Sequence, residues 1–156
     1  MRFLADCNVG RLARWLRVLG YDAAYDSRST DPALVARALA ERRVLLTRDV
    51  DLTRRRVIVS GALPTVLVTG DRVEDQLRQV LRELDLAPPG PDGGLTRCLE
   101  CNVELEAREK AAVEAQLPPY VRATQDRFSQ CPHCGRVYWP GTHWERMRAR
   151  MAALAR

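Results

Sequence analysis

The stretch that decides the fold is Val44-Leu45-Leu46-Thr47-Arg48-Asp49, an apolar run that ends abruptly in polar residues. Such a run, with helical patterns on both sides, predicts a strand buried on both faces of a parallel sheet. Met1-Arg2-Phe3-Leu4-Ala5-Asp6 repeats the pattern at the start of the chain. Ligands of open α/β sheets bind at the carboxyl ends of the strands. If the two strands are neighbours, Asp6 and Asp49 meet at that edge and form a shared acidic site.

The residues on either side of these strands alternate between strand and helix patterns. Apolar residues between positions 11 and 19 recur on one helical face, and Gly20 supplies a C-terminal stop. The remaining expected elements are strands at residues 22–25 and 65–68, and helices that start around Pro32 and at Val73. This alternation predicts an α/β domain with a parallel sheet and helices on both faces.

A stretch rich in proline and glycine, residues 87–94, interrupts the apolar periodicity. Such a stretch is typical of a domain boundary. The 156 residues allow one domain of ordinary size and a small appendage. We therefore expect an α/β domain at residues 1–87, a linker at 88–95, and a small zinc-binding domain at 96–156 that ends in a basic helix.

Four of the five cysteines form two Cys-x-x-Cys pairs, Cys98 with Cys101 and Cys131 with Cys134. In a reducing compartment such pairs favour a metal over disulfides, and a second matched pair argues against a redox role. Four thiolates complete a closed tetrahedral zinc site, so we expect this zinc to be structural and not catalytic. A helix over residues 104–116 is expected to occupy the long segment between the pairs.

Two more carboxylates accompany those of the acidic site. Asp31 starts a helix, where it could also serve as the N-cap. Asp51 lies in an expected loop and ranks below Asp49, which is nearer the strand end. Oxygen ligands suit Mg²⁺ or Mn²⁺. Two such ions about 4 Å apart can activate water and stabilise the leaving oxygen of a phosphodiester. Cys7, which has no partner by spacing, is expected to be a small buried residue.

The net charge of +5 comes almost entirely from arginine. A modest basic excess favours a polyanionic partner, although arginine enrichment can also reflect genome composition. Arg11, Arg14 and Arg48 lie beside the expected acidic site and are candidates for phosphate contacts; a solvated helix face is the alternative for the first two. Trp139 and His143 belong to an aromatic stretch that either packs over the zinc domain or binds RNA by stacking on bases.

Several functional classes lack support in the sequence. No apolar window is long enough to span a membrane, and the N-terminus lacks a signal-peptide pattern. We therefore expect no membrane partner and a cytoplasmic location. The first domain has no Gly-rich phosphate loop and no nucleophile elbow. The oligomeric state and the RNA substrate are left open by the sequence.

Several runs of residues match a known family. They are Phe3-Leu4-Ala5-Asp6, Gly10-Arg11-Leu12-Ala13-Arg14-Trp15-Leu16-Arg17, Leu19-Gly20-Tyr21-Asp22, Leu45-Leu46-Thr47-Arg48-Asp49, Arg97-Cys98-Leu99-Glu100-Cys101-Asn102, Cys131-Pro132-His133-Cys134-Gly135-Arg136-Val137-Tyr138-Trp139 and Gly141-Thr142-His143-Trp144. On these residues the chain resembles the Mut-seven C-terminal RNase domain family, which joins a PIN-like nuclease domain to a zinc ribbon. The resemblance implies a PIN-like fold, dependence on Mg²⁺ or Mn²⁺, RNA cleavage, and an acidic cluster at Asp6, Asp31 and Asp49.

The chain departs from the PIN pattern at one point. PIN nucleases commonly carry an acid deeper in a helix, and here the second expected helix offers only Glu41, with Asp51 or Asp71 as substitutes. The function we expect is a metal-dependent ribonuclease that hydrolyses RNA at the aspartate cluster. Two alternatives stay open: a non-catalytic PIN-like module that binds RNA or the ribosome, and a toxin-like nuclease of a toxin–antitoxin pair, which the zinc domain disfavours.

Overall fold

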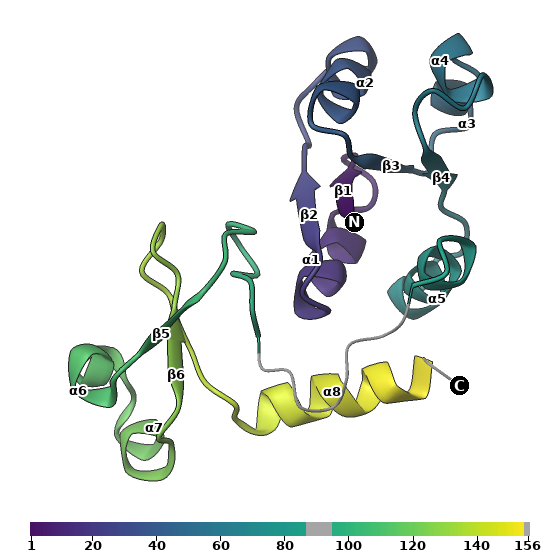
Figure 1. Cartoon of the computed structure of the whole chain (residues 1–156). Coiled ribbons are helices and arrows are strands. Elements are labelled where there is room, and N and C mark those ends of the chain that lie inside the picture. Colours follow the sequence, from purple (N-terminus) through teal and green to yellow (C-terminus); the bar gives the residue numbers. More distant parts are fainter. Residues whose placement is uncertain (87–94, 155–156) are drawn as a thin grey trace. The chain divides into compact units, whose positions relative to one another are not determined.

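A computed structural model of the protein describes residues 1–86 and 95–154 (Figure 1). The chain divides into two compact units, Met1–Ala87 and Pro88–Arg156, called here the N-terminal unit and the C-terminal unit. The expected linker at 88–95 lies outside the described residues, except for Leu95. In the described part of the chain, every helix is too short or too polar to cross a lipid bilayer.

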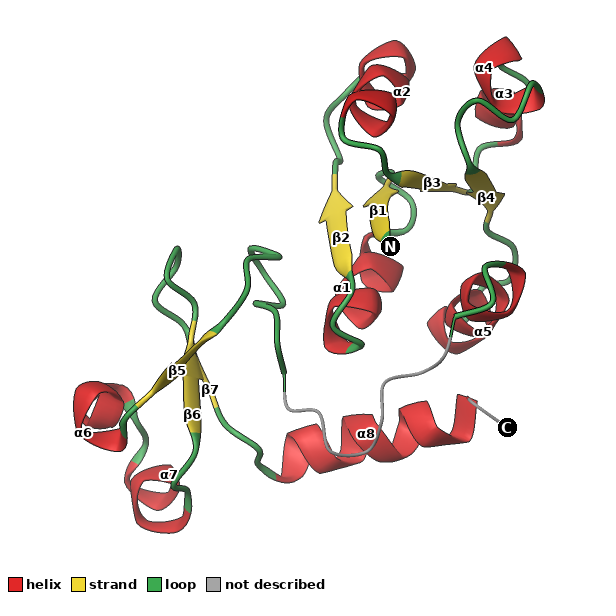
Figure 2. Cartoon of the chain, in the orientation of Figure 1, coloured by secondary structure: helices red, strands yellow, loops and turns green. Residues whose placement is uncertain are grey.

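A four-stranded parallel sheet forms the centre of the N-terminal unit, and helices flank it (Figure 2). Its strands are β1 (Arg2–Ala5), β2 (Asp22–Tyr25), β3 (Val44–Thr47) and β4 (Thr65–Leu67), in the spatial order β2-β1-β3-β4. Its helices are α1 (Gly10–Val18), α2 (Asp31–Ala40), α3 (Val50–Thr53), α4 (Arg56–Val59) and α5 (Val73–Glu83). The predicted parallel α/β class is confirmed.

The hydrophobic core of the N-terminal unit has two layers, one on each face of the sheet. Leu4 and Leu45 of the sheet pack in one buried cluster with Leu34 of α2 and Leu52 of α3. Successive side chains of a strand point to opposite faces, so the neighbours of Leu4 and Leu45 face the other way. There α1 packs against β1, β2 and α5. All four residues of β3 are buried, as expected for a strand covered on both faces.

The end of α1 shows how one glycine fixes the entry into the next strand. Gly20 has a φ of 84°, a left-handed conformation that L-residues with side chains rarely adopt. Its N–H donates to the carbonyl of Arg17, and the N–H of Tyr21 donates to the carbonyl of Leu16. This pair of bonds is the Schellman motif, and the predicted helix stop at Gly20 is confirmed.

The C-terminal unit contains a three-stranded antiparallel sheet in the order β5-β6-β7. Its elements are β5 (Glu106–Arg108), α6 (Lys110–Val113), a 3₁₀ turn (Glu114–Gln116), α7 (Pro119–Thr124), β6 (Phe128–Gln130), β7 (Val137–Tyr138) and α8 (Thr142–Leu154). The helix expected over residues 104–116 is wrong in its first half, where β5 pairs with β6. Pairing along a sheet edge overrides a local helix preference there.

Candidate functional site

The carboxyl ends of β1 and β3 form the edge at which the sequence predicts an acidic site. These strands are parallel neighbours in the centre of the sheet, and Ala5 is aligned with Leu46. The chain leaves β1 toward β2 on one side and leaves β3 toward β4 on the other. The direction in which the chain moves across the sheet therefore reverses between β1 and β3, and open α/β sheets bind ligands at such a point. Asp6 stands directly at it, and its N–H donates to the carbonyl of Leu46 over 3.1 Å.

A buried threonine joins Asp6 to Asp49. The hydroxyl of Thr47, which is fully buried, donates a hydrogen bond to Oδ2 of Asp6. The backbone N–H of Asp49 in turn donates to the same Thr47 oxygen over 2.9 Å. Oδ1 of Asp6, which is only 5% exposed, accepts from the N–H of Asn8 over 2.9 Å. The acidic edge, defined here as Asp6, Thr47 and Asp49, is therefore one connected network.

Asp49 is held by a helix start that the sequence did not predict. Its Oδ1 caps α3 by accepting from the N–H groups of Asp51 and Leu52, at 2.8 and 3.2 Å. Within the described residues, no hydrogen bond is recorded for its Oδ2, which leaves that oxygen available to a ligand. Asp51 lies on α3 and not in the expected loop, because the Asp49 cap starts a helix there. Its carboxylate is 85% exposed and pairs with Arg54.

Asp31 is the first residue of α2, but it does not cap that helix. The N-cap position belongs to Thr30, so the capping alternative for Asp31 is wrong. Asp31 instead forms an ion pair of 3.3 Å with Arg55, which precedes α4. Among the described residues, the only group of three or more metal-binding side chains with ligand atoms within 4.8 Å consists of cysteines. The three predicted aspartates are therefore not drawn into a tight three-carboxylate cluster.

Two of the candidates for a further acid, the helix residue Glu41 and the substitute Asp71, already have partners. Glu41 precedes β3 and so lies at the amino end of the sheet, opposite the acidic edge. A hydrogen bond from Arg37, and then one from Arg43, lowers the pKa of Glu41. Asp71 follows β4 and pairs with Arg48 over 3.1 Å, so this predicted phosphate contact already has an acidic neighbour.

The arginines of α1 divide into structural and exposed ones. Arg17 is buried, and its Nε donates to the carbonyl of Ala23 over 2.8 Å, which fixes α1 to β2. Arg11 and Arg14 are exposed on the same helix, whose first residue follows the Asp6 loop by only a few positions. Both side chains are therefore exposed on the helix that follows the Asp6 loop.

Tyr25 is an aromatic residue at this edge that sequence reasoning missed. It ends β2, aligned with Ala5, and its side chain is 43% exposed. Its hydroxyl donates to the carbonyl of Cys7 over 3.3 Å, and a Cβ at Gly10 would lie 2.8 Å from its ring. Gly10 is the only sequence signal for this close approach. Cys7 is exposed, so the expectation that it is buried is wrong: its carbonyl, not its thiol, makes the contact.

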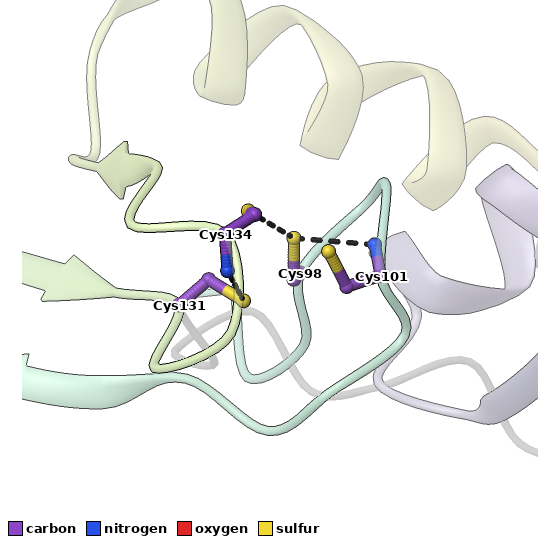
Figure 3. Close-up of side chains that lie close together, drawn as sticks. All are labelled: Cys98, Cys101, Cys131 and Cys134. Carbon is purple, nitrogen blue, oxygen red and sulfur yellow. Dashed lines mark hydrogen bonds between the residues drawn. The ribbon is translucent and has the colours of Figure 1, made fainter.

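The four cysteines of the C-terminal unit form a cluster that can hold a metal ion such as zinc (Figure 3). All four Sγ atoms lie within 4.8 Å of one another, and those of Cys98 and Cys134 are 3.7 Å apart. Tetrahedral zinc with Zn–S bonds of about 2.3 Å requires sulfurs about 3.8 Å apart. Both the donor atoms and their spacing fit this ion.

Each cysteine pair lies in the same kind of turn. The N–H of Cys101 donates to the Sγ of Cys98 over 3.4 Å, and the second pair repeats this contact. The residues after each pair, Asn102 and Gly135, have φ values of 65° and 74°. Asparagine and glycine are the residues that tolerate this left-handed conformation best. The sequence therefore shapes both turns so that their sulfurs face one point.

Tyr138 supports the cysteine cluster from β7. Its hydroxyl lies 3.2 Å from the Sγ of Cys98 and accepts from the N–H of Leu99 over 3.1 Å. Burial raises the pKa of Cys98, but the Tyr138 hydroxyl and two backbone N–H groups outweigh it and bring the value to about 6. Burial and the neighbouring thiols raise the pKa of Cys101 to about 12. A divalent cation among the sulfurs offsets the repulsion that opposes its ionisation.

The two predicted RNA contacts of this unit have different environments. Trp139 is half-buried and packs against the apolar cluster of Val113, Leu117 and Phe128. His143 is exposed near the start of α8. Part of the Trp139 side chain therefore packs inside the C-terminal unit, as one of the two alternatives predicted, while His143 faces solvent.

Comparison with known proteins places the chain in a family. The model of the Mut7-C RNAse domain matches residues 1–151, which include both the acidic edge and the cysteine cluster. Searches of curated proteins and of solved structures each return no match. The match confirms the resemblance seen in the sequence, and it covers nearly the whole chain. On this evidence the chain belongs to the Mut7-C RNAse domain family.

Proposed function

We propose that the protein is a metal-dependent ribonuclease that hydrolyses RNA phosphodiester bonds at the acidic edge. Membership of an RNase domain family supports a nuclease-type function. The observation that carries the finer proposal is the network in which Thr47 joins Asp6 to Asp49 at the reversal point of the sheet. Two carboxylates from neighbouring strands are thereby fixed at the sheet edge where open α/β sheets bind their ligands.

The oxygen atoms of the acidic edge fit a hard divalent cation. Mg²⁺ in enzymes that act on nucleic acids commonly uses one or two carboxylates, and water and substrate phosphates complete its shell. Asp6 and Asp49 supply that number and would hold Mg²⁺ or Mn²⁺, while Asp31 and Asp51 are paired with Arg55 and Arg54. The bound ion supplies an activated water and neutralises charge on the leaving oxygen.

The protein's own groups position the substrate. Thr47 and the N–H of Asn8 hold the Asp6 carboxylate in one orientation, and the α3 cap does the same for Asp49. Fixed carboxylates reduce the entropy lost when metal and phosphate are brought together. Arg11 and Arg14, which are exposed on the neighbouring helix, contact the RNA phosphates on either side of the cleaved bond.

The C-terminal unit contributes a structural zinc in this proposal. Cys98, Cys101, Cys131 and Cys134 occupy all four positions of a tetrahedral ion, so no position is open for water or substrate. The small apolar cluster of this unit provides little stability by itself, and a zinc ion would supply the remainder.

Two amide variants test the proposal. Asp6→Asn and Asp49→Asn keep the side-chain shape but remove the charge that binds the cation. We expect each to lower the rate of RNA cleavage in Mg²⁺ or Mn²⁺ by at least about 100-fold, as for loss of a charge-stabilising group, while RNA binding is retained. The matched control is Asp75→Asn on α5, which is 52% exposed and pairs with Arg78. Equal cleavage by all three variants and the parent protein would refute the assignment.

One observation favours a second candidate, a PIN-like module that binds RNA without cutting it. Among the described residues, no three carboxylates bring their oxygens within 4.8 Å of one another. A centre that needs three protein carboxylates is therefore incomplete. Purified protein that binds RNA but leaves it intact with either Mg²⁺ or Mn²⁺ would establish this second function instead.

A further inference from the structure

A cavity of about 390 Å³ lies in the C-terminal unit, apart from the acidic edge. Its volume falls at the low end of the range for pockets that take small molecules, about 300–1,000 Å³. The residues that line it include four aromatic ones and two arginines: Phe128, Tyr138, Trp139, Trp144, Arg108 and Arg127. Aromatic rings and guanidinium groups together are the set that binds single-stranded nucleic acid.

The floor of the cavity is a row of three residues across the sheet. Ala107 of β5 is paired with Ser129 of β6, which is paired in turn with Tyr138 of β7. Paired residues on adjacent antiparallel strands point to the same face. All three line the cavity, and the two small side chains leave space beside the larger tyrosine. The pairing of the three strands therefore accounts for the hollow, because it places two small side chains next to Tyr138.

Trp139 is held in a defined position at the wall of this cavity. It packs on one side against the apolar cluster that contains Phe128. On another side it lies against Gly141, where an added Cβ would be 3.1 Å from the indole Nε1. Gly141 therefore gives the indole room that any other residue would reduce. A ring fixed in this way loses little further entropy when a base stacks on it.

The charged residues that line the cavity are Arg108, Glu109, Asp126 and Arg127, and they differ in how they are engaged. Arg108 forms an ion pair with Glu106, and Asp126 forms one with Lys110. Arg127 is exposed, and within the described residues no ion pair or hydrogen bond of its side chain is recorded. Its guanidinium is available to a phosphate, for which its planar fork of donors is well suited.

We propose that this cavity binds one unpaired nucleotide, with the base stacked on Trp139 and the phosphate paired with Arg127. Bases inside a duplex do not expose a face to a pocket, so the ligand is single-stranded RNA. The identity of RNA as the natural ligand rests on the proposed function. The site itself does not depend on cleavage.

Adenosine 5′-monophosphate is the probe, because it has no internucleotide bond that the acidic edge could cut. Its binding to the full zinc-loaded chain is measured by isothermal titration at millimolar nucleotide without added Mg²⁺ or Mn²⁺. We expect Trp139→Leu to weaken binding about tenfold, the scale of one lost stacking contact. Arg127→Ala is expected to weaken it about fivefold, the upper end for an ion pair of an exposed side chain.

Two further variants keep the test decisive. Arg122→Ala removes an exposed arginine of α7 that does not line the cavity, and binding should stay within about twofold. Gly141→Ala moves the indole without removing it and should weaken binding by less than Trp139→Leu. No binding by the parent chain, or equal weakening by Arg127→Ala and Arg122→Ala, overturns the proposal. If the protein binds the nucleotide but does not cleave RNA, the ribonuclease proposal is refuted and the nucleotide site is not. If it cleaves RNA but does not bind the nucleotide, the nucleotide site is refuted and the ribonuclease proposal is not.

Discussion

Replacing Thr47 by valine tests the network of the acidic edge in one step. Valine has nearly the same shape as threonine, so the core of the sheet stays filled. The change removes the hydroxyl that donates to Asp6 and accepts from the N–H of Asp49. Because Thr47 is fully buried, water cannot replace the lost hydroxyl without disturbing the packing.

The expected loss of stability follows from these two bonds. A hydrogen bond to an ionised carboxylate contributes about 1.5–3 kcal/mol, and an unsatisfied, half-buried N–H costs about 1 kcal/mol. Burying the additional methyl group of valine offsets about 0.8 kcal/mol. The free energy of unfolding of the N-terminal unit should therefore fall by roughly 2–3 kcal/mol. RNA cleavage should fall at least about tenfold, because the Asp6 carboxylate is no longer fixed.

Hydrogen–deuterium exchange with mass spectrometry measures this change in the N-terminal unit separately from the C-terminal one. Amides of β1 and β3 that exchange through global opening should do so on the order of 30- to 150-fold faster in Thr47→Val. The control is Thr65→Val in β4, whose hydroxyl donates to the carbonyl of Leu63 and joins no carboxylates. Exchange and cleavage that change equally in both variants would show that Thr47 has no special role at this edge.

Three further predictions concern other parts of the chain. Metal analysis should find about one zinc per chain, and a chelator or Cys98→Ser should unfold the C-terminal unit while circular dichroism of the parallel sheet is retained. Gly10→Ala should displace the Tyr25 ring, which a Cβ would approach to 2.8 Å, and lower the urea midpoint by the equivalent of about 1 kcal/mol, because this ring is partly exposed and can move. Hydrogen bonds from the Ser29 N–H, and then its hydroxyl, lower the pKa of Asp26 to about 2. The Asp26 carboxylate therefore stabilises the fold above its ordinary pKa near 3.8, and this stabilisation is lost as the pH falls toward 2; the urea midpoint of Asp26→Asn should depend less on pH in that window.

Much of the fold could be predicted from the sequence because its central strands are short and uniformly apolar. Residues 44–47 have no polar side chain except the final threonine, and that pattern between two helical patterns is typical of a parallel strand covered on both faces. The positions of Asp6 and Asp49 at the strand ends follow from strand length alone. The two cysteine turns could also be predicted from local sequence, because the Cys-x-x-Cys spacing fixes the geometry of each turn.

The parts that the sequence did not reveal depend on contacts between distant residues. Asp49 caps α3, and so brings Asp51 onto a helix, only because the chain turns sharply after β3. Arg17 shows the same limit: its position on a charged helix stripe gives no sign that it is buried against the carbonyl of Ala23. β5 is Glu-Ala-Arg, a sequence with no strand preference, and it forms a strand only because β6 pairs with it.

The cysteine turns enclose residues 102–130, and this enclosed segment carries its own apolar cluster of Val113, Leu117 and Phe128. Loop closure depends only weakly on length, so the metal-binding turns place little constraint on what lies between them. The enclosed segment can therefore be replaced by another sequence while the four cysteines stay the same. Such a replacement would change which ligands the C-terminal unit binds. Such exchange offers a route by which proteins built on this scaffold acquire new targets.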